Sequence, residues 1–147
     1  GKDARNVPAG QTRDYIFGYT ILNDVSARDV QTAHKQWYFG KSLDGFTPIG
    51  PCIVTADAFA DYPPRLGIRS FVNGEKRQDS NTALQIFDID HVVAELSQGM
   101  TLKAGTIIAT GTPAGVGMGM DPPQFLKPGD VVRCEIEGIG TLTNPVK

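Results

Sequence analysis

The sequence predicts a mainly β fold with a few short helices. Its 147 residues include 17 glycines and 10 prolines, spread along the chain as turn residues are in a protein of many short strands. Short apolar runs rich in β-branched residues recur between these turns. The length suits one domain and we find no linker that divides the chain, so residues 1–147 are predicted to form a single domain.

The composition excludes several broad classes of protein. A net charge of −2 gives no electrostatic footprint for nucleic acid or for an anionic membrane surface. No apolar run approaches the roughly 20 residues that a membrane-spanning helix needs. Cys52 and Cys134 each lie in an apolar, strand-like run, so we expect two buried free thiols in a reducing compartment. We therefore expect a cytoplasmic protein with neither a nucleic-acid nor a membrane partner.

Two strands and one short helix are predicted in the first third of the chain. The helix falls within residues 8–18, with Pro8 in its first turn and Gly18 beyond its end. Residues 19–23, YTILN, follow as a strand. Residues 48–56, PIGPCIVTA, form the second strand, with prolines at its entry.

A second short helix is predicted over residues 26–35, SARDVQTAHK. Ser26 is the expected N-cap, and Asp29, three residues on, gives an acidic variant of the capping box. Asp24 would then lie just before the helix, near the unpaired backbone N–H groups of its first turn.

The second half carries a hairpin and the clearest helix of the chain. Asn73-Gly74 is a favoured type I′ pair, because both central residues of that turn need positive φ. Residues 88–99 form a helix whose C′ position is expected at Gly99. Its apolar stripe consists of Ile89, Val92, Val93 and Leu96.

Two later segments, LKAGTIIATG and LKPGDVVRCEIEG, each predict a turn followed by a strand. They span residues 102–111 and 126–138, and Pro128-Gly129 fits the centre of a type II turn. A closing hairpin is expected over residues 137–146. Between the two units lies a glycine-rich loop, TGTPAGVGMGMDPP, at residues 110–123.

A dense set of polar side chains follows the strand at residues 19–23, which favours a binding site there. Asp24 at the strand end suits a hard cation such as Mg²⁺, which prefers carboxylate and water oxygens. The alternative is that Asp24 caps the helix or pairs with Arg28. Arg28 and Gln31 are three residues apart and can share a helix face, offering a planar fork for a carboxylate beside an amide. The alternative for these two is a solvated face with a local ion pair.

Three further residues are candidates for the same chemistry. Lys41, in the turn FGKSLDGF, could deliver positive charge to an enolate or a carboxylate, but it lacks the glycine spacing of a nucleotide-binding P-loop. Thr112, in TGTP, offers a hydroxyl beside backbone N–H groups that could bind an anion; a flexible loop is the alternative. His34 is a minor candidate for a base, whereas His91 is expected to face solvent.

Taken together, five segments resemble the catalytic domain of the fumarylacetoacetate hydrolase family. The resemblance runs from about Gly18 to the end of the chain, in order, and several long motifs in register make it specific. The segments are GYTILNDVSARDVQ, QWYFGKSLDGFTPIGP, VNGEKRQDSNT, LSQGMTLKAGTIIATGTPAGVG and FLKPGDVVRCEIEGIGTLTNPV. The resemblance implies a mixed β-sandwich roll of the C-terminal domain type and a homodimer.

The resemblance also implies a site and a chemistry. It implies Mg²⁺, Mn²⁺ or Ca²⁺ held by three acidic side chains, with Asp24 as a ligand. By motif match, Lys41 approaches the substrate, Arg28 and Gln31 line the pocket, and Thr112 meets the anionic end of the substrate. Lys41 and Arg28 are the expected catalytic residues, while Arg28, Gln31 and Thr112 are expected to bind the substrate.

The function that this resemblance favours is cleavage of a C–C bond in a 2,4-diketo acid, such as an acylpyruvate or fumarylpyruvate, through an enolate. Isomerisation of 2-hydroxyhepta-2,4-diene-1,7-dioate and decarboxylation of oxaloacetate are alternatives within the same family. A non-catalytic module that binds an anion or a partner chain is the alternative of another class.

One departure from the family pattern concerns the metal ligands. The resemblance implies an E-x-E pair just upstream of the segment that begins here, and a His–Glu pair further upstream, yet no Glu precedes Glu75. We therefore expect the C-terminal part of an enzyme that lacks its N-terminal strands, with weak metal affinity and weak activity alone. A complementary N-terminal fragment is the expected partner.

Overall fold

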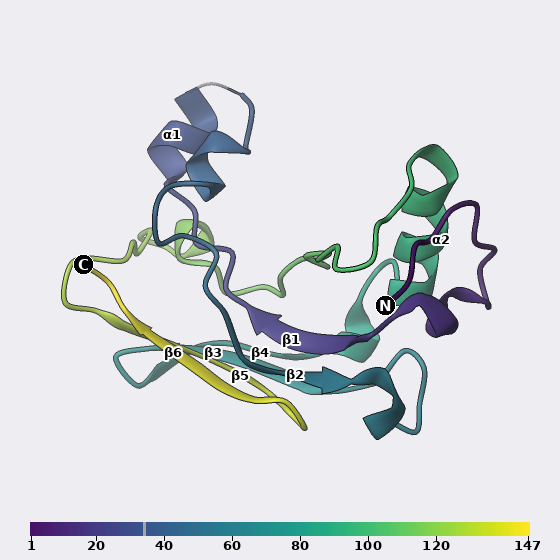
Figure 1. The fold of residues 1–147 in the computed structure, drawn as a ribbon. Coiled ribbons are helices and arrows are strands. Elements are labelled where there is room, and N and C mark those ends of the chain that lie inside the picture. Colours follow the sequence, from purple (N-terminus) through teal and green to yellow (C-terminus); the bar gives the residue numbers. More distant parts are fainter. Residues whose placement is uncertain (34) are drawn as a thin grey trace.

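The computed structural model describes residues 1–33 and 35–147, and its mainly β architecture confirms the predicted fold class (Figure 1). Two antiparallel sheets carry the fold, one with the order β1-β2 and one with the order β4-β3-β5-β6. The strands are β1 (Gly18–Leu22), β2 (Ile49–Thr55), β3 (Gly67–Val72), β4 (Glu75–Asn81), β5 (Val131–Ile136) and β6 (Gly140–Pro145). His34, the minor candidate for a base, lies outside the described residues.

Helices are few and short. The α-helices are α1 (Arg28–Ala33) and α2 (Ile89–Gly99), and the 3₁₀ helices are η1 (Thr12–Tyr15), η2 (Phe39–Lys41), η3 (Ala56–Ala58), η4 (Thr82–Leu84) and η5 (Gly117–Gly119). Among the described helices, none has both the length and the apolar character that crossing a bilayer requires.

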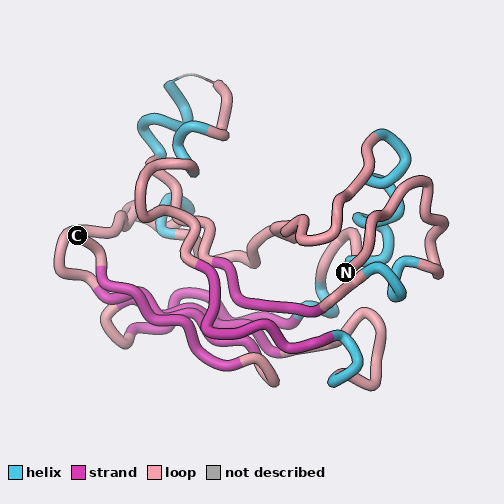
Figure 2. Tube along the Cα trace, viewed as in Figure 1, coloured by secondary structure: helices cyan, strands magenta, loops and turns pink. Residues whose placement is uncertain are grey.

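The two sheets form two layers (Figures 1 and 2). The ribbon of β1 and β2 lies over the four-stranded sheet, and the cyan helices of Figure 2 gather at the two ends of these layers. Ile21 of β1 is 2% exposed, and Pro51 of β2 lies 3.4 Å from where a Cβ on Gly140 would stand. An edge-to-face contact between Tyr19 and Phe59, with ring centroids 5.6 Å apart, adds to the packing of β1.

The predicted hairpin is confirmed. Asn73 and Gly74 have φ angles of +51° and +85°, and Val72 pairs with Glu75 across the turn. The turn unit at residues 126–138 and the closing hairpin also form, as β5 and β6, which pair from Val131↔Pro145 to Ile136↔Gly140.

The predicted helix near residue 90 is confirmed as α2, and its apolar stripe faces a small core. Ala4, Val7, Val93 and Leu102 form this core, against which Ile89 and Leu96 pack. The N-terminal arm is held there because Ala4 and Leu102 exchange two backbone hydrogen bonds of 2.8 and 2.9 Å. Asp88 caps α2 by accepting from the N–H of His91, which is exposed as expected.

A partly buried chain of hydrogen bonds links η1 to α2. Thr12, fully buried, donates to Asp90 Oδ1 at 2.5 Å, and Asp90 Oδ2 accepts from the N–H of Gly10 at 2.7 Å. Since the Thr12 hydrogen goes to Asp90, its oxygen accepts from the hydroxyl of Tyr62. Burial raises the pKa of Tyr62, so its phenol keeps the proton that this bond uses.

Three predicted helix features are wrong. The helix within residues 8–18 is only the 3₁₀ helix η1, because Gly10 has a φ of +84° that no right-handed helix contains. Ser26 is not an N-cap: its hydroxyl donates to the carbonyl of Asp24, two residues back, and α1 begins at Arg28. Gly99 is the last residue of α2 rather than a left-handed C′ residue, and Met100 continues in extended conformation.

Two other predictions are also wrong. Residues 106–111 do not form a strand, because no described strand lies beside them to pair with, and Gly111 has a φ of +94°. Both cysteines are free thiols as expected, but Cys52 is exposed on β2 and only Cys134 is partly buried. Burial accordingly raises the pKa of the Cys134 thiol.

Replacing Thr12 by Val is expected to lower the free energy of unfolding by about 1–3 kcal/mol, because Tyr62 and Asp90 each lose a buried hydrogen-bond partner. Urea denaturation followed by circular dichroism measures this loss. Thr12→Ser keeps the hydroxyl and should cost much less. Equal losses in the two variants would show that the methyl group, and not the hydrogen-bond chain, provides the stability.

Candidate functional site

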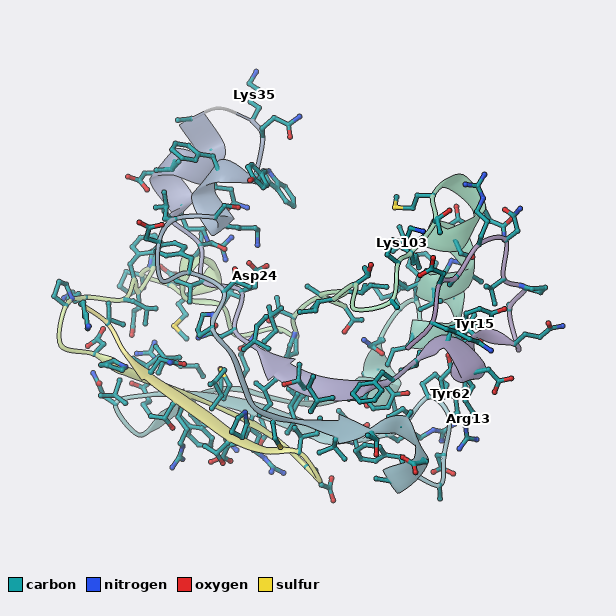
Figure 3. All side chains as sticks on the ribbon, viewed as in Figure 1. Arg13, Tyr15, Asp24, Lys35, Tyr62 and Lys103 are labelled. Carbon is teal, nitrogen blue, oxygen red and sulfur yellow. The ribbon has the colours of Figure 1, made fainter. Side chains whose placement is uncertain are left out.

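Four of the five predicted site residues lie in one segment, which we call the α1–η2 module (residues 23–33 and 35–47). The chain leaves β1 at Leu22 and rises away from the sheets into α1 (Figure 1). The base of the module is closed by a backbone hydrogen bond of 3.0 Å from Asn23 to Pro48. Figure 3 shows Asp24 at this base, at the end of β1 away from Tyr62 and Arg13.

A glycine holds the two halves of the module together. The N–H of Ala27 donates to the carbonyl of Gly40 at 2.8 Å. A Cβ on Gly40 would stand 2.8 Å from the backbone N of Gln31 and 2.9 Å from the carbonyl of Ala27. Only glycine permits this approach, which places η2, and with it Lys41, against the first turn of α1.

Asp24 and Lys41 form an ion pair across the module. Lys41 Nζ donates to Asp24 Oδ2, and the side chains are 27% and 43% exposed for Lys41 and Asp24 respectively. The backbone of Lys41 is fixed in turn, since its carbonyl accepts from the hydroxyl of Thr47 at 3.1 Å. Asp24 thus neither caps α1 nor pairs with Arg28, the two alternatives considered from the sequence.

Arg28 and Gln31 share one face of α1, as their spacing predicts. Arg28 Nη1 donates to Gln31 Oε1 at 2.9 Å. Gln31 is only 5% exposed, so its amide is a fixed acceptor that holds the guanidinium in place. A guanidinium held in this way can present its remaining N–H groups to a planar carboxylate.

Thr112 lies on a second element, the glycine-rich loop at residues 110–123. Its hydroxyl oxygen accepts from Gln78 Nε2 at 2.8 Å, and the same nitrogen donates to the carbonyl of Pro113 at 2.8 Å. Gly115 packs directly against β4, because a Cβ at this position would stand 2.0 Å from the carbonyl oxygen of Arg77. Among the described residues, no hydrogen bond joins the Thr112 side chain to the α1–η2 module.

The acidic groups do not form a complete metal site. Nowhere in residues 1–33 and 35–147 do three His, Cys, Asp or Glu side chains come together with the geometry of a metal site. Asp24 lies beside a cation, Lys41, and the other two carboxylates among the described residues of the module, Asp29 and Asp44, do not join it in a metal cluster. This donor set fits one ligand position of a carboxylate-rich site, not the whole site.

An apolar groove of about 350 Å³ lies outside the α1–η2 module. Its lining comes from β1, the N-terminal arm, α2 and residues 105–108. Phe17, Ile53 and Ile107, which are 60%, 58% and 61% exposed, are among its lining residues. None of the five predicted site residues lines this groove.

The comparison with known protein families identifies the chain. The model of the C-terminal domain of fumarylacetoacetate hydrolase matches residues 1–147, the whole sequence. The chain belongs to the fumarylacetoacetate hydrolase family. This confirms the resemblance seen in the sequence motifs.

Relatives in this family bear the names of different reactions. The chain is 47% identical, over 146 residues, to the oxaloacetate tautomerase YisK of Bacillus subtilis (strain 168), covering 99% of this chain and 48% of the relative. A fumarylacetoacetate hydrolase from psychrophilic Exiguobacterium antarcticum has a TM-score of 0.96 and 52% identity, covering 100% of this chain and 52% of that one. The 2-hydroxyhepta-2,4-diene-1,7-dioate isomerase of Mycobacterium marinum has a TM-score of 0.87 and 48% identity, with coverages of 99% and 53%.

The chain therefore spans about half the length of these relatives. The TM-scores of 0.96 and 0.87 show that it shares its fold with the corresponding halves of the two solved structures. Enzymes named as tautomerase, hydrolase and isomerase are all among its relatives, so membership of the family does not by itself fix the reaction.

Three residues that organise the site, Gly40, Arg77 and Gln78, do not stand out in the sequence. Gly40 is one of 17 glycines, and only the three-dimensional approach of η2 to α1 distinguishes it. Arg77 and Gln78 lie in a polar strand, EKRQDSN, whose residues look alike in a single sequence. The predicted Asn73-Gly74 turn locates the hairpin correctly. It does not indicate that the second strand of the hairpin contacts the glycine-rich loop.

Gly115→Ala is expected to destabilise the glycine-rich loop, because the new Cβ would meet the Arg77 carbonyl and the φ of +109° strains any L side chain. We expect the free energy of unfolding to fall by about 1–3 kcal/mol, with faster proteolytic cleavage within residues 110–123. Gly119→Ala is the matched control, since its Cβ would stand 3.8 Å from the nearest atom, an ordinary van der Waals contact with Val116. Similar behaviour of the two variants would contradict the close packing of Gly115 on β4.

Proposed function

We propose that the protein containing this chain is an enzyme that converts a small 2-oxo acid through its enolate, with tautomerisation of an oxaloacetate-like dicarboxylate as the leading reaction. The observation that carries the proposal is the α1–η2 module, which holds Asp24 and Lys41 in contact beside the fixed Arg28–Gln31 pair. The similarity to an oxaloacetate tautomerase at 47% identity supports this choice of reaction.

The side chains of this chain suit the binding of such a substrate. Arg28, fixed by the buried amide of Gln31, would bind the carboxylate next to the 2-oxo group. Lys41 would place its positive charge near the 2-oxo oxygen, where negative charge develops as the enolate forms. Thr112 would donate its hydroxyl to the distal carboxylate. In the tautomerisation a proton leaves carbon 3 and a proton is added to the oxygen on carbon 2.

Asp24 would be a ligand for Mg²⁺, Mn²⁺ or Ca²⁺, with the other acidic ligands supplied from outside these 147 residues. A hard cation prefers carboxylate oxygens, and Asp24 offers one at the base of the module. When bound, the cation would polarise the 2-oxo group of the substrate. Lys41, which now pairs with Asp24, would be released to turn toward the substrate.

Cleavage of a C–C bond in a 2,4-diketo acid is the second candidate, because a fumarylacetoacetate hydrolase is 52% identical to this chain. Isomerisation of a 2-hydroxy-diene-dioate also passes through an enolate of its substrate, and the similarity to the M. marinum relative supports it. A panel of oxaloacetate, acylpyruvates and 2-hydroxyhepta-2,4-diene-1,7-dioate, assayed with Mg²⁺ and with Mn²⁺, separates these reactions. Failure to convert any of them would favour the non-catalytic binding module.

The partners that we propose are a further polypeptide segment in the groove and a second copy of the complete protein. Among the described strands, β1 pairs only with β2, so its other edge is unpaired. We find no backbone–backbone hydrogen bond for Ile107, Ile108 or Ala109 across from it, within the part of the chain that is described. An extended apolar segment in the groove would satisfy both edges and cover Phe17, Ile53 and Ile107.

Replacing Asp24 by Asn in the full-length protein is expected to lower both Mn²⁺ affinity and kcat/KM by about 100-fold or more. Mutating residues that only support a metal ligand typically costs about 10- to 100-fold, and losing the ligand itself should cost at least as much. Calorimetry measures the affinity and the substrate panel measures turnover. Asp29→Asn, at an exposed position in the first turn of α1, is the matched control. Wild-type Mn²⁺ binding in Asp24→Asn would exclude Asp24 as a ligand.

The substitution Ile107→Asp tests whether a further segment occupies the groove in the full-length protein. Ile107 is 61% exposed here, so the substitution should leave the thermal stability of the isolated 147-residue chain unchanged. In the full-length protein it should destabilise by about 2 kcal/mol or more, since it would bury a charge without a partner. Thermal denaturation compares the two lengths, with Ile107→Val as the conservative control. No difference between the two lengths would mean that the groove stays open.

A further inference from the structure

We propose that Gln78 is a positioning residue that aims the hydroxyl hydrogen of Thr112 at a carboxylate of the substrate. The proposal rests on the proposed function, in which Thr112 binds the distal carboxylate. Gln78 lies on β4, outside the α1–η2 module, and its contacts with the glycine-rich loop carry the argument.

The direction of each hydrogen bond around Gln78 follows from its neighbours. The carbonyl of Pro113 can only accept, so the atom 2.8 Å from it must be the amide nitrogen Nε2. The second hydrogen of that nitrogen goes to Thr112 Oγ1 at 2.8 Å. The amide oxygen then faces Ser70, whose hydroxyl donates to it at 2.8 Å. Turning the amide over would break the bond to Pro113, because two oxygens that can only accept would then face each other.

This arrangement leaves the hydroxyl hydrogen of Thr112 directed away from Gln78. A threonine hydroxyl has one hydrogen, and its oxygen already accepts from Gln78. No hydrogen bond donated by Thr112 is present within the described part of the chain. The Thr112 hydroxyl can therefore donate to an anionic oxygen of a ligand. Hydrogen bonds to charged groups are stronger than those between neutral groups, so such an oxygen is its best acceptor.

A β-bulge makes the contact possible. Ser70 pairs with Gln78, and Phe71 pairs with Lys76, so Arg77 is an extra residue on β4. In a regular strand the side chains of Arg77 and Gln78 would point to opposite faces. Here both reach the glycine-rich loop or the residue that follows it: Arg77 Nη1 donates to Gln124 Oε1 at 2.6 Å, and Gln78 donates to Thr112.

The two neighbours therefore have separable roles. Arg77 also contacts Met120 and pairs with Glu75, so it anchors the far end of the loop to β4. Gln78 alone, of the two, touches Thr112. A substitution at Gln78 can thus change the direction of the Thr112 hydroxyl while Arg77 and Gly115 keep the loop on the strand.

Gln78→Glu in the full-length protein is the decisive variant. A carboxylate at this position only accepts, so Thr112 would donate to it and turn its hydrogen away from the substrate. We expect KM for the dicarboxylate substrate to rise about tenfold or more, with kcat changed less than about threefold. Gln98→Glu, on the exposed face of α2, makes the same chemical change away from the loop and should leave both constants unchanged.

A double-mutant cycle with Thr112→Val shows whether Gln78 acts through Thr112. In the Thr112→Val background, Gln78→Glu should raise KM no further, because the hydroxyl that it redirects is absent. An unchanged KM in Gln78→Glu, or additive effects in the double variant, would overturn the proposal. If Gln78→Glu fails to fold, Gln78→Met removes both donors without adding charge and should raise KM by a smaller factor, again only when Thr112 is present.

Malate binding separates this inference from the proposed function, because this four-carbon dicarboxylate has a distal carboxylate for Thr112. If the wild-type protein converts no substrate of the panel, the proposed function fails, and calorimetry with malate in the presence of Mn²⁺ then tests Gln78. Weaker malate binding in Gln78→Glu, but not in Gln98→Glu, would support its role. Equal binding in all three proteins, or no binding by the wild type, would overturn it.

Discussion

The hydrogen bond from Ala27 to Gly40 is the constraint on which the candidate site depends. It joins the start of α1 to η2, and the missing side chain of Gly40 lets the two backbones approach. Because of this contact, Asp24 and Lys41, 17 positions apart, come into direct contact, while Arg28 and Gln31 lie on the adjoining turn. The sheets below supply only the point from which the module rises.

The polar groups are supported in two different ways. In the α1–η2 module, opposite charges hold one another, and the partial exposure of Asp24 and Lys41 lets either exchange its partner for a ligand at small cost. On the glycine-rich loop, neutral hydrogen bonds from Ser70 through Gln78 fix the direction of Thr112. The Asp24–Lys41 pair is thus able to rearrange when a cation or a substrate binds, whereas the Thr112 hydroxyl is already oriented before binding.

Local chemistry decided which features the sequence could predict. Asn73-Gly74 and the stripe of α2 were predicted because turn geometry and helical periodicity depend on neighbouring residues alone. The strand at residues 106–111 was wrong because a strand needs a partner, and β propensity does not supply one. For the site, family motifs selected Asp24, Arg28, Gln31, Lys41 and Thr112, but Gly40 and Gln78 act through contacts between distant segments that a single sequence does not display.

The most direct test of the central claim is a crystal structure of the full-length protein with Mn²⁺ and oxalate, in which anomalous scattering locates the ion. The account predicts the ion about 2.0–2.2 Å from an Asp24 carboxylate oxygen, Lys41 turned from Asp24 to the oxalate, and Arg28 still held by Gln31. An ion bound elsewhere, with the Asp24–Lys41 pair intact, would contradict it.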